Sequence, residues 1–394
     1  MLRKPCVFSA VTALLIIVIS YYQDCCPYPL FDSLDRYSWI HHIIYKNIDE
    51  PLPNDVLLVS TSNDQELVKT TQGNASIADR GKLAAFLQIA DSCRNYKLIL
   101  YDILFESEYV SENDSLLGTI LSRLPNLIIV RDVDIKGRRS SLQFEKQLID
   151  KTAFNSYYYP FFNANFSRYQ FIQEGRASVA LKMHELLDSQ TIHKHSLWSS
   201  WHGRLVKASP IINLSNNMRS IERDGSFSIT NCNIGKDYLE SVSDDTLGML
   251  MQNKIIVIGD FDNDVHDTYV GKVPGSLIAL AAYEYLKSGK HLITFEYLLF
   301  ILYFGMCFLI VSDTYLRLRE KLQEKLCGKL YNIFHNNRII LLIISFITYS
   351  LILSLISSLI YCLFNHVAIS VIVPSIVFTI LSNIQESGIK ICKK

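Results

Sequence analysis

An acidic stretch is the part of this chain whose residue types and spacing come closest to a chemical site. It has aspartates at alternate positions, then a histidine and a further aspartate: Asp260, Asp262, Asp264, His266 and Asp267. Hard cations prefer several carboxylate oxygens close together, so the first three aspartates resemble the start of a calcium-binding loop. The pattern then breaks, because Val265 stands where the turn needs glycine and Gly271 where a bidentate glutamate is needed. A bound cation and a solvated or helix-capping loop are both open.

No other stretch predicts catalysis. The sequence has no glycine-rich phosphate loop, no nucleophile elbow and no Cys-His signature. A group of histidine and tryptophan residues follows no zinc spacing; it comprises His193, His195, Trp198, Trp201 and His202. We therefore predict no enzyme, no catalytic residue, no metal centre and no cofactor. A hydrolase that uses Asp102 and Asp267 is the least favoured alternative.

Two predicted strands position the acidic residues. The β-branched run at 255–258 reads as a strand that is buried on both faces, and Gly259 ends it. A second strand is predicted at 98–104, and Asp102 lies near its end. Open parallel sheets bind ligands outside the carboxyl ends of their strands. We therefore predict a ligand-binding site that consists of Asp102, Asp260, Asp262, Asp264, His266 and Asp267.

Strand and helix signals alternate along the part of the chain that contains these residues. Strands are predicted at 56–59 and 126–130, and helices after the N-cap candidate Asp79 and at 276–286. This alternation predicts an α/β fold with a parallel or mixed sheet and helices on both faces. Between about residues 135 and 253 the pattern gives no topology.

Three segments combine such elements with particular polar residues. They are IIVIG with the loop of Asp267 and VPGSLIALAAYEYLKSGK, then Arg80 with its helix and KLILYDILFES, and FNANFSRYQFIQEGRASVALKMHEL. Together they cover most of residues 30–290 and resemble the CHASE2 domain, an extracytoplasmic sensor module of bacterial membrane receptors. The chain departs from that family where Ser60-Thr61 replaces an Ile-Asp pair and where the Trp-Pro before Arg80 is absent. The resemblance implies a sensor domain, which in this family typically precedes a cytoplasmic output domain.

Four apolar runs, at 6–22, 293–312, 339–364 and 367–384, predict transmembrane helices, because a bilayer crossing takes roughly 20 helical residues. Basic residues flank these runs so that the positive-inside rule places both termini in the cytoplasm. The predicted α/β fold therefore comes with four transmembrane helices. The predicted divisions are an N-terminal anchor (1–23), an extracytoplasmic sensor domain (24–292), transmembrane helix 2 (293–313), a basic cytoplasmic loop (314–338), a transmembrane hairpin (339–384) and a short cytoplasmic tail (385–394).

The basic loop repeats leucine at every fourth position, with lysines beside the leucines. Such a helix has one apolar stripe, which lies in a membrane interface or docks on a partner; a solvated connecting helix is the plainer alternative. The residues predicted to contact a partner are Leu318, Lys321, Leu322, Lys325, Leu326 and Lys329.

These features predict a receptor-like protein of the bacterial inner membrane that senses an unknown stimulus and passes it to another protein. Its predicted partners are the lipid bilayer, an extracytoplasmic ligand and a separate signalling output protein, and a homodimer is open. A structural or assembly protein of the cell envelope without any ligand is the alternative. Lys+Arg 38 equals Asp+Glu 38, and this zero net charge argues against nucleic acid as a partner.

Overall fold

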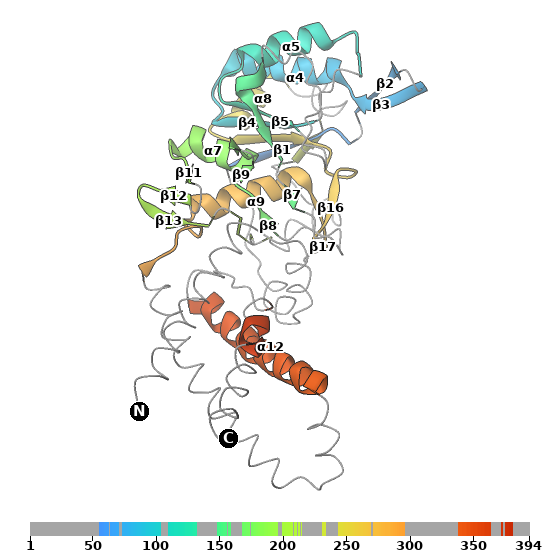
Figure 1. The fold of residues 1–394 in the computed structure, drawn as a ribbon. Helices are drawn as coiled ribbons and strands as arrows, with labels where there is room; N and C mark the ends of the chain where they lie inside the picture. The colour runs from blue at the N-terminus through green and yellow to red at the C-terminus, as the bar shows by residue number, and fades with distance from the viewer. Residues whose placement is uncertain are drawn as a thin grey trace, which may run out of the picture.

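The structure is a computed structural model of the 394-residue chain, and it describes residues 55–295, 338–363, 372 and 375–380. Gaps within the first range fall at 63, 71–72, 104–108, 132–147, 156, 159–167, 174, 196–198, 208, 211, 213, 215–230, 234–242 and 269–270. Figure 1 shows the described part of 55–295 as a layered α/β unit, followed along the chain by helix α12 (Arg338–Leu363).

A six-stranded sheet forms the middle layer, and all of its strand pairs are parallel. The strands, in spatial order, are β14 (Asn231–Asn233), β1 (Val56–Ser60), β15 (Ile255–Gly259), β4 (Leu98–Asp102), β5 (Leu127–Arg131) and β6 (Thr152–Phe154). Every residue of β1, β4, β5 and β15 is buried. Their unbroken apolar runs are what a sheet covered on both faces requires, so the predicted parallel arrangement is present.

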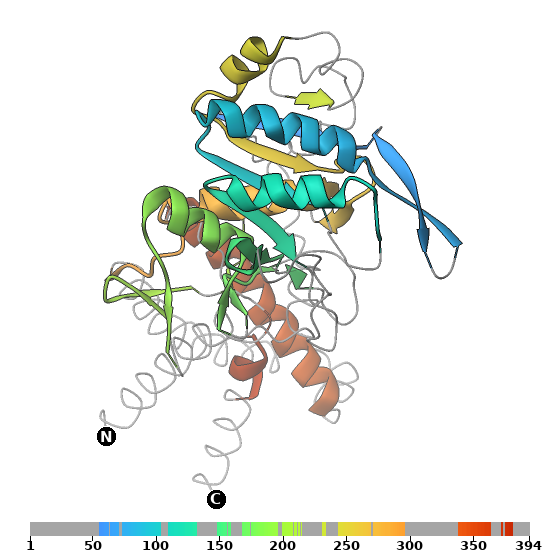
Figure 2. The same cartoon turned by 90° about the horizontal axis from the view of Figure 1, so that it is seen from above.

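Helices cover both faces of the sheet (Figures 1 and 2). Alternate residues of β1 enter two different apolar cores: Leu57 and Val59 pack in one, and Val56 and Leu58 in the other. The first core includes side chains of α4 (Arg80–Cys93), α5 (Asp114–Arg123) and α8 (Asp244–Met251). The second includes side chains of α7 (Val179–Asp188) and α9 (Gly275–Lys287). Fully burying one aliphatic side chain stabilises the fold by about 1.5–3 kcal/mol, so these two cores hold the layers together.

Side chains cap the starts of three of the helices that cover the sheet. The predicted cap Asp79 accepts a hydrogen bond from the Lys82 amide at 3.0 Å, and Ser178 and Ser243 cap α7 and α8 in the same way. These side chains satisfy amides that have no partner within the helix. No side chain caps α5, whose N-cap position is Asn113, or α9, whose N-cap position is Pro274.

Short hairpins surround the sheet. Strands β2 (Gln65–Thr70) and β3 (Gly73–Ala78) form a hairpin that projects from the domain in Figures 1 and 2. The region predicted as a plain acidic loop contains a second hairpin instead, of β16 (Val265–Thr268) and β17 (Gly271–Pro274). The remaining short elements are η1 (Ile149–Lys151), β7 (Tyr157–Tyr158), β8 (Arg168–Tyr169), β9 (Ile172–Gln173), β10 (Arg176–Ala177), β11 (His193–Lys194), β12 (Ser199–Trp201) and β13 (Arg204–Val206).

The four predicted transmembrane helices are not supported. Among the residues that the structure describes, no helix combines the length and the apolar character needed to cross a membrane. The third predicted span coincides with α12, to which the same finding applies. The run at 6–22 and most of the runs at 293–312 and 367–384 lie outside the described residues.

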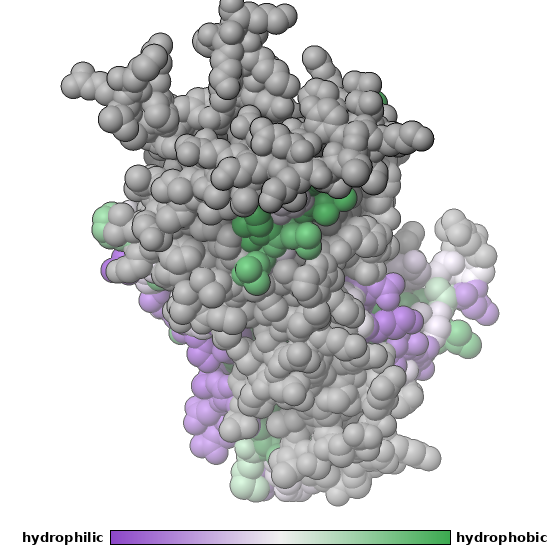
Figure 3. All heavy atoms as spheres, turned by 90° about the horizontal axis from the view of Figure 1, so that it is seen from below, coloured by the Kyte–Doolittle hydropathy of each residue, from purple (hydrophilic) through white to green (hydrophobic). Residues whose placement is uncertain are grey.

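The described part of α12 presents apolar side chains on its surface. Figure 3, which views the molecule from below, shows green apolar atoms on the face where α12 lies. The exposed apolar residues of this helix include Ile339, Leu342, Ile343, Ile347, Leu351 and Leu355. The residues predicted to contact a partner, 318–329, lie outside the described residues.

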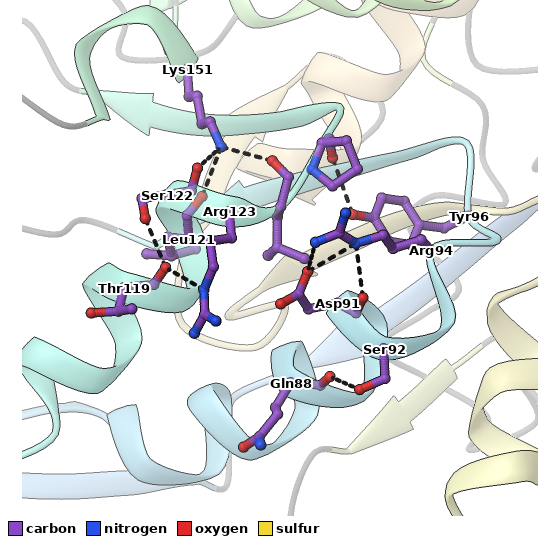
Figure 4. A network of polar contacts seen from close by, with 12 residues as sticks. Gln88, Asp91, Ser92, Arg94, Tyr96, Thr119, Leu121, Ser122, Arg123 and Lys151 are labelled. Atoms are coloured by element: carbon purple, nitrogen blue, oxygen red, sulfur yellow. Dashed lines mark hydrogen bonds and ion pairs between the residues drawn. The ribbon is translucent and has the colours of Figure 1, made fainter.

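One lysine caps the carboxyl end of α5 by hydrogen bonding to its carbonyl oxygens. Lys151 Nζ donates hydrogen bonds to the carbonyl oxygens of Leu121 (3.0 Å), Ser122 (2.6 Å) and Leu124 (2.7 Å) (Figure 4). Burial lowers the pKa of Lys151, while the charge of Asp91 opposes that shift. These carbonyls have no partner within the helix, so the lysine supplies their hydrogen bonds.

We expect Lys151→Met to destabilise the protein by about 1–3 kcal/mol, because the helix end loses charge-assisted hydrogen bonds in a part-buried place. Urea unfolding followed by circular dichroism measures this loss. Arg94→Met is the matched control, because the Arg94 Nη2 to Asp91 Oδ1 contact of 2.6 Å is exposed and such pairs contribute under about 1 kcal/mol. Equal losses in the two variants would contradict this role for Lys151.

Candidate functional site

The carboxyl ends of the central strands form the candidate site, and we call this edge the rim. It consists of residues 60–62 and 64 at and after the end of β1, Asp102 at the end of β4, residues 259–264 at and after the end of β15, and Ser276 beside them in α9. Strand β15 lies between β1 and β4. The chain leaves β1 and β4 toward α4 and α5 on one face, whereas it leaves β15 toward α9 on the other. Neighbouring strands that diverge in this way open the crevice where parallel sheets bind ligands.

The last residues of the three strands stand in one row. Ser60 pairs with Gly259, and Gly259 pairs with Asp102. They continue the strand positions that face α9, because Leu58, Val257 and Leu100, two positions earlier, pack in the core that contains α9. A Cβ atom at Gly259 would lie 3.3 Å from Ser276 Oγ and 3.7 Å from Asp102 Cβ. Glycine therefore allows Asp102 and the first turn of α9 to approach each other.

Asp102 is the most unusual group of the rim. It is 8% exposed, and among the described residues its carboxyl group makes no hydrogen bond or ion pair. Burial, and to a smaller extent the negative charge of Asp264, raise the pKa of Asp102 to about 8. Asp102 is therefore mostly protonated and neutral at pH 7, and it can donate a hydrogen bond or lose its proton when a positive charge approaches.

Asp260 has the opposite character. Its Oδ1 accepts hydrogen bonds from Ser62 Oγ at 2.8 Å and from the Asn263 amide at 3.0 Å, and Asn263 Nδ2 donates to Oδ2 at 2.8 Å. Burial alone would raise the pKa of Asp260, but these hydrogen bonds and one from the Asp262 amide outweigh it and hold the pKa below its usual value. Asp260 is therefore an ionised carboxylate that ties the loop after β15 to the loop after β1.

The other predicted site residues are brought to the rim only in part. Asp264 is largely exposed, and its Oδ1 lies 3.4 Å from His266 Nε2. Asp262 and Asp267 are exposed, and Asp267 lies on β16 opposite Lys272. The described residues contain no group of three or more His, Cys, Asp or Glu side chains placed to hold a metal ion. The calcium-like spacing of the aspartates therefore does not become a metal site in the described structure.

Rim residues that were not predicted from the sequence include Ser62, Asp64 and Ser276. Asp64 is buried, and its Oδ1 accepts a hydrogen bond from Lys82 Nζ at 2.7 Å, whereas its Oδ2 is buried without a hydrogen bond to a described residue. Ser276 is 2% exposed in the first turn of α9. Their position directly after β1, or directly after the Pro274-Gly275 helix start, was the signal available in the sequence.

A buried ion pair lies on the opposite face of the sheet, close to the rim. Arg80 Nη1, at the start of α4, contacts Asp114 Oδ1, at the start of α5, and both residues are at most 5% exposed. Asp114 Oδ2 also accepts a hydrogen bond from the Ser111 amide at 2.8 Å. The Tyr101 hydroxyl is buried without a hydrogen bond to a described residue, and burial raises its pKa. This ion pair joins the start of α4 to the start of α5, near the carboxyl end of β4.

A histidine cluster lies where the chain leaves the domain after α9. The ring centroid of His291 lies 6.2 Å from that of His184 and 5.8 Å from that of Trp201. His184 Nδ1 lies 2.7 Å from Asp188 Oδ2. Burial first, and then His184, lower the pKa of His291 to about 4. His291 is therefore neutral at neutral pH, and its neighbours differ from the surface histidine group expected from the sequence.

We expect His291→Phe to reduce the acid sensitivity of the fold. Because the pKa of folded His291 lies below the usual 6.5, its contribution to stability is full above pH 6.5 and is lost as the pH falls toward 4. The lost free energy is at most about 3 kcal/mol, from about 1.4 kcal/mol per pKa unit. Urea unfolding at pH 7 and pH 4.5 measures it, with exposed His195→Phe as the control. An unchanged difference between the two pH values in His291→Phe would contradict the assignment.

Comparison of the chain with protein-family models, with curated proteins and with solved structures found no match. Nothing in these comparisons points to a CHASE2 domain, so that resemblance stays a prediction that rests on the three sequence segments described above.

Proposed function

We propose that the α/β domain is a ligand-binding sensor module whose ligand binds at the rim. The observation that carries this is Asp102, a residue 8% exposed whose carboxyl group has no hydrogen-bond partner among the described residues. Burying an unpaired polar group costs on the order of 1–3 kcal/mol or more, and strongly shifted carboxyl groups at strand ends mark functional sites. A ligand group that pairs with Asp102 would remove this cost.

Helix α9 supplies a route from the rim to the rest of the chain. It starts at Gly275 next to the rim and has 13 residues, so it is about 20 Å long. Beyond its end, the Lys207 amide donates to the His291 carbonyl oxygen at 2.9 Å, and the Ile293 amide donates to the Leu205 carbonyl oxygen at 3.0 Å. A ligand that binds more tightly to one of two conformations of the rim and α9 would therefore shift residues 288–293, which follow α9.

The output of this sensor would be a separate protein that contacts the basic leucine-repeat segment at 318–329. A structural role without a ligand is the competing function. The two differ in a measurable way, because only a sensor has a small-molecule ligand that stabilises the folded domain through the rim.

A thermal-shift screen of the full chain against amines, carboxylates, phosphates, sugars and divalent cations tests the proposed function. We expect at least one class to raise the melting temperature, and Asp102→Asn to abolish that shift. Asp262→Asn is the matched control, because Asp262 carries the same charge in the same loop and is exposed. If no class shifts the melting temperature, or if the shift survives in Asp102→Asn, the rim is not a sensor site.

A further inference from the structure

The charges around Asp102 limit what the rim can bind. Asp260 and Asp264 follow Gly259, the residue paired with Asp102. Among the described residues none of these three carboxyl groups contacts a lysine or arginine, and His266, 3.4 Å from Asp264, is the only basic side chain in contact with them. Tyr169 is the other titratable group whose charge couples to that of Asp102. The rim therefore attracts cations and repels anions.

Polar groups at the rim also suit one kind of cation. Ser276 is 2% exposed, and its hydroxyl, like the Asp102 carboxyl, has no hydrogen-bond partner among the described residues. Ser276 Oγ and Asp102 Cβ, the atom that carries the carboxyl group, lie 3.3 Å and 3.7 Å from the point that a Cβ atom of Gly259 would occupy. A protonated amine carries three N–H donors, so it can donate to the Asp102 carboxylate and to the Ser276 hydroxyl together. A metal ion would need more ligands than the described residues bring together.

We infer that the ligand of the rim is an organic cation with a protonated amine, which pairs with Asp102 and displaces the proton of that carboxyl group into the solvent. This inference rests on the proposed function and names the ligand class of the same site. Protons and charge balance in this step, because neutral Asp102 and the ammonium ion give a carboxylate–ammonium pair and one proton in the solvent. Asp260 stays ionised throughout, since its hydrogen bonds to Ser62 and Asn263 already hold it in that state.

Isothermal titration calorimetry of the full chain with ethanolamine and with putrescine tests the inference. At pH 7, titrations in phosphate and in MOPS report the protons released, since the two buffers differ in ionisation enthalpy and neither is a primary amine. We expect close to one proton released per amine bound. We also expect the dissociation constant to rise about tenfold per pH unit as the pH falls from 7.5 to 6, because ever more Asp102 must be deprotonated.

Variants identify the groups involved. Asp102→Asn should weaken amine binding at least about 100-fold and abolish proton release, since a charge pair inside the protein is lost. Ser276→Ala should weaken binding but keep proton release, and Asp262→Asn should leave both unchanged. A ligand of another class whose binding depends on Asp102 would overturn the amine assignment and leave the proposed function standing. If no amine binds, or if amines bind Asp102→Asn as tightly as the wild type, the inference is wrong.

Discussion

Asp102→Asn is expected to make the protein more stable at neutral pH, by on the order of 4 kcal/mol at pH 7. The unfolded chain ionises Asp102 near pH 3.8, whereas the folded protein holds its pKa at about 8. Between these values the folded state keeps a proton that the unfolded state releases. Stability that is present below pH 3.8 is therefore lost as the pH rises toward 8. Asparagine has no such proton, so the variant avoids the loss.

Urea unfolding at pH 4.5, 6, 7 and 8 checks this result. The wild type should lose stability along this series relative to Asp102→Asn, and the two should converge at the acid end. The exposed Asp262→Asn variant should follow the wild type at every pH. Wild-type and Asp102→Asn curves that run parallel across the series would show that Asp102 is ionised in the folded protein. If Asp102→Asn gains stability and loses ligand binding, then Asp102 serves function at the expense of stability.

Asp114→Ala is expected to destabilise the protein by about 3–5 kcal/mol, because it removes the carboxylate that neutralises a buried arginine. Arg80 is 3% exposed and cannot release its proton, so its charge stays in the interior after Asp114 is gone. The first turn of α5 also loses the hydrogen bond from the Ser111 amide. Guanidinium unfolding measures the loss as a lower midpoint of the transition.

Two controls separate burial from charge. Asp55→Ala removes the partner of Lys97, an exposed pair with 2.6 Å between Nζ and Oδ2, and should cost under about 1 kcal/mol. The double variant Arg80→Met with Asp114→Leu should recover most of the stability, since apolar residues of similar size often replace a buried ion pair without loss. A double variant as unstable as Asp114→Ala would mean that the cost comes from packing rather than from an unpaired charge.

The sequence predicts the central layers of this fold because their signals are local. The run at 255–258 and the strand that leads to Asp102 are continuous apolar stretches, and only a sheet covered on both faces buries such stretches fully. Asp79 stands before an apolar helix and caps it. The hairpin of β16 and β17 is missed, because each strand has only four residues and their charged side chains read as a loop.

The candidate site is only partly predictable, because it depends on strand order and burial. Asp102 follows from its place at a strand end, but nothing local shows that β15 separates it from β1 or that Ser276 lies beside it. The spacing of Asp260, Asp262 and Asp264 suggested convergence. In the structure Asp260 turns back to Ser62 and Asn263, whereas the other two aspartates are exposed. Regular spacing of residues in a loop does not determine where their side chains point, since a loop lacks the constant geometry of a helix or strand.

The place of β15 has a consequence for biosynthesis. Strand β15 is the last strand of the sheet to leave the ribosome, yet it fills the middle, where Val56 pairs with Ile255 and Leu98 pairs with Ile255 on the other side. Until residue 259 has emerged, β1 and β4 cannot complete the sheet and each presents an open edge. Such edges are templates for intermolecular pairing. We therefore expect a chain truncated before residue 255 to be insoluble, because β1 and β4 would keep these open edges.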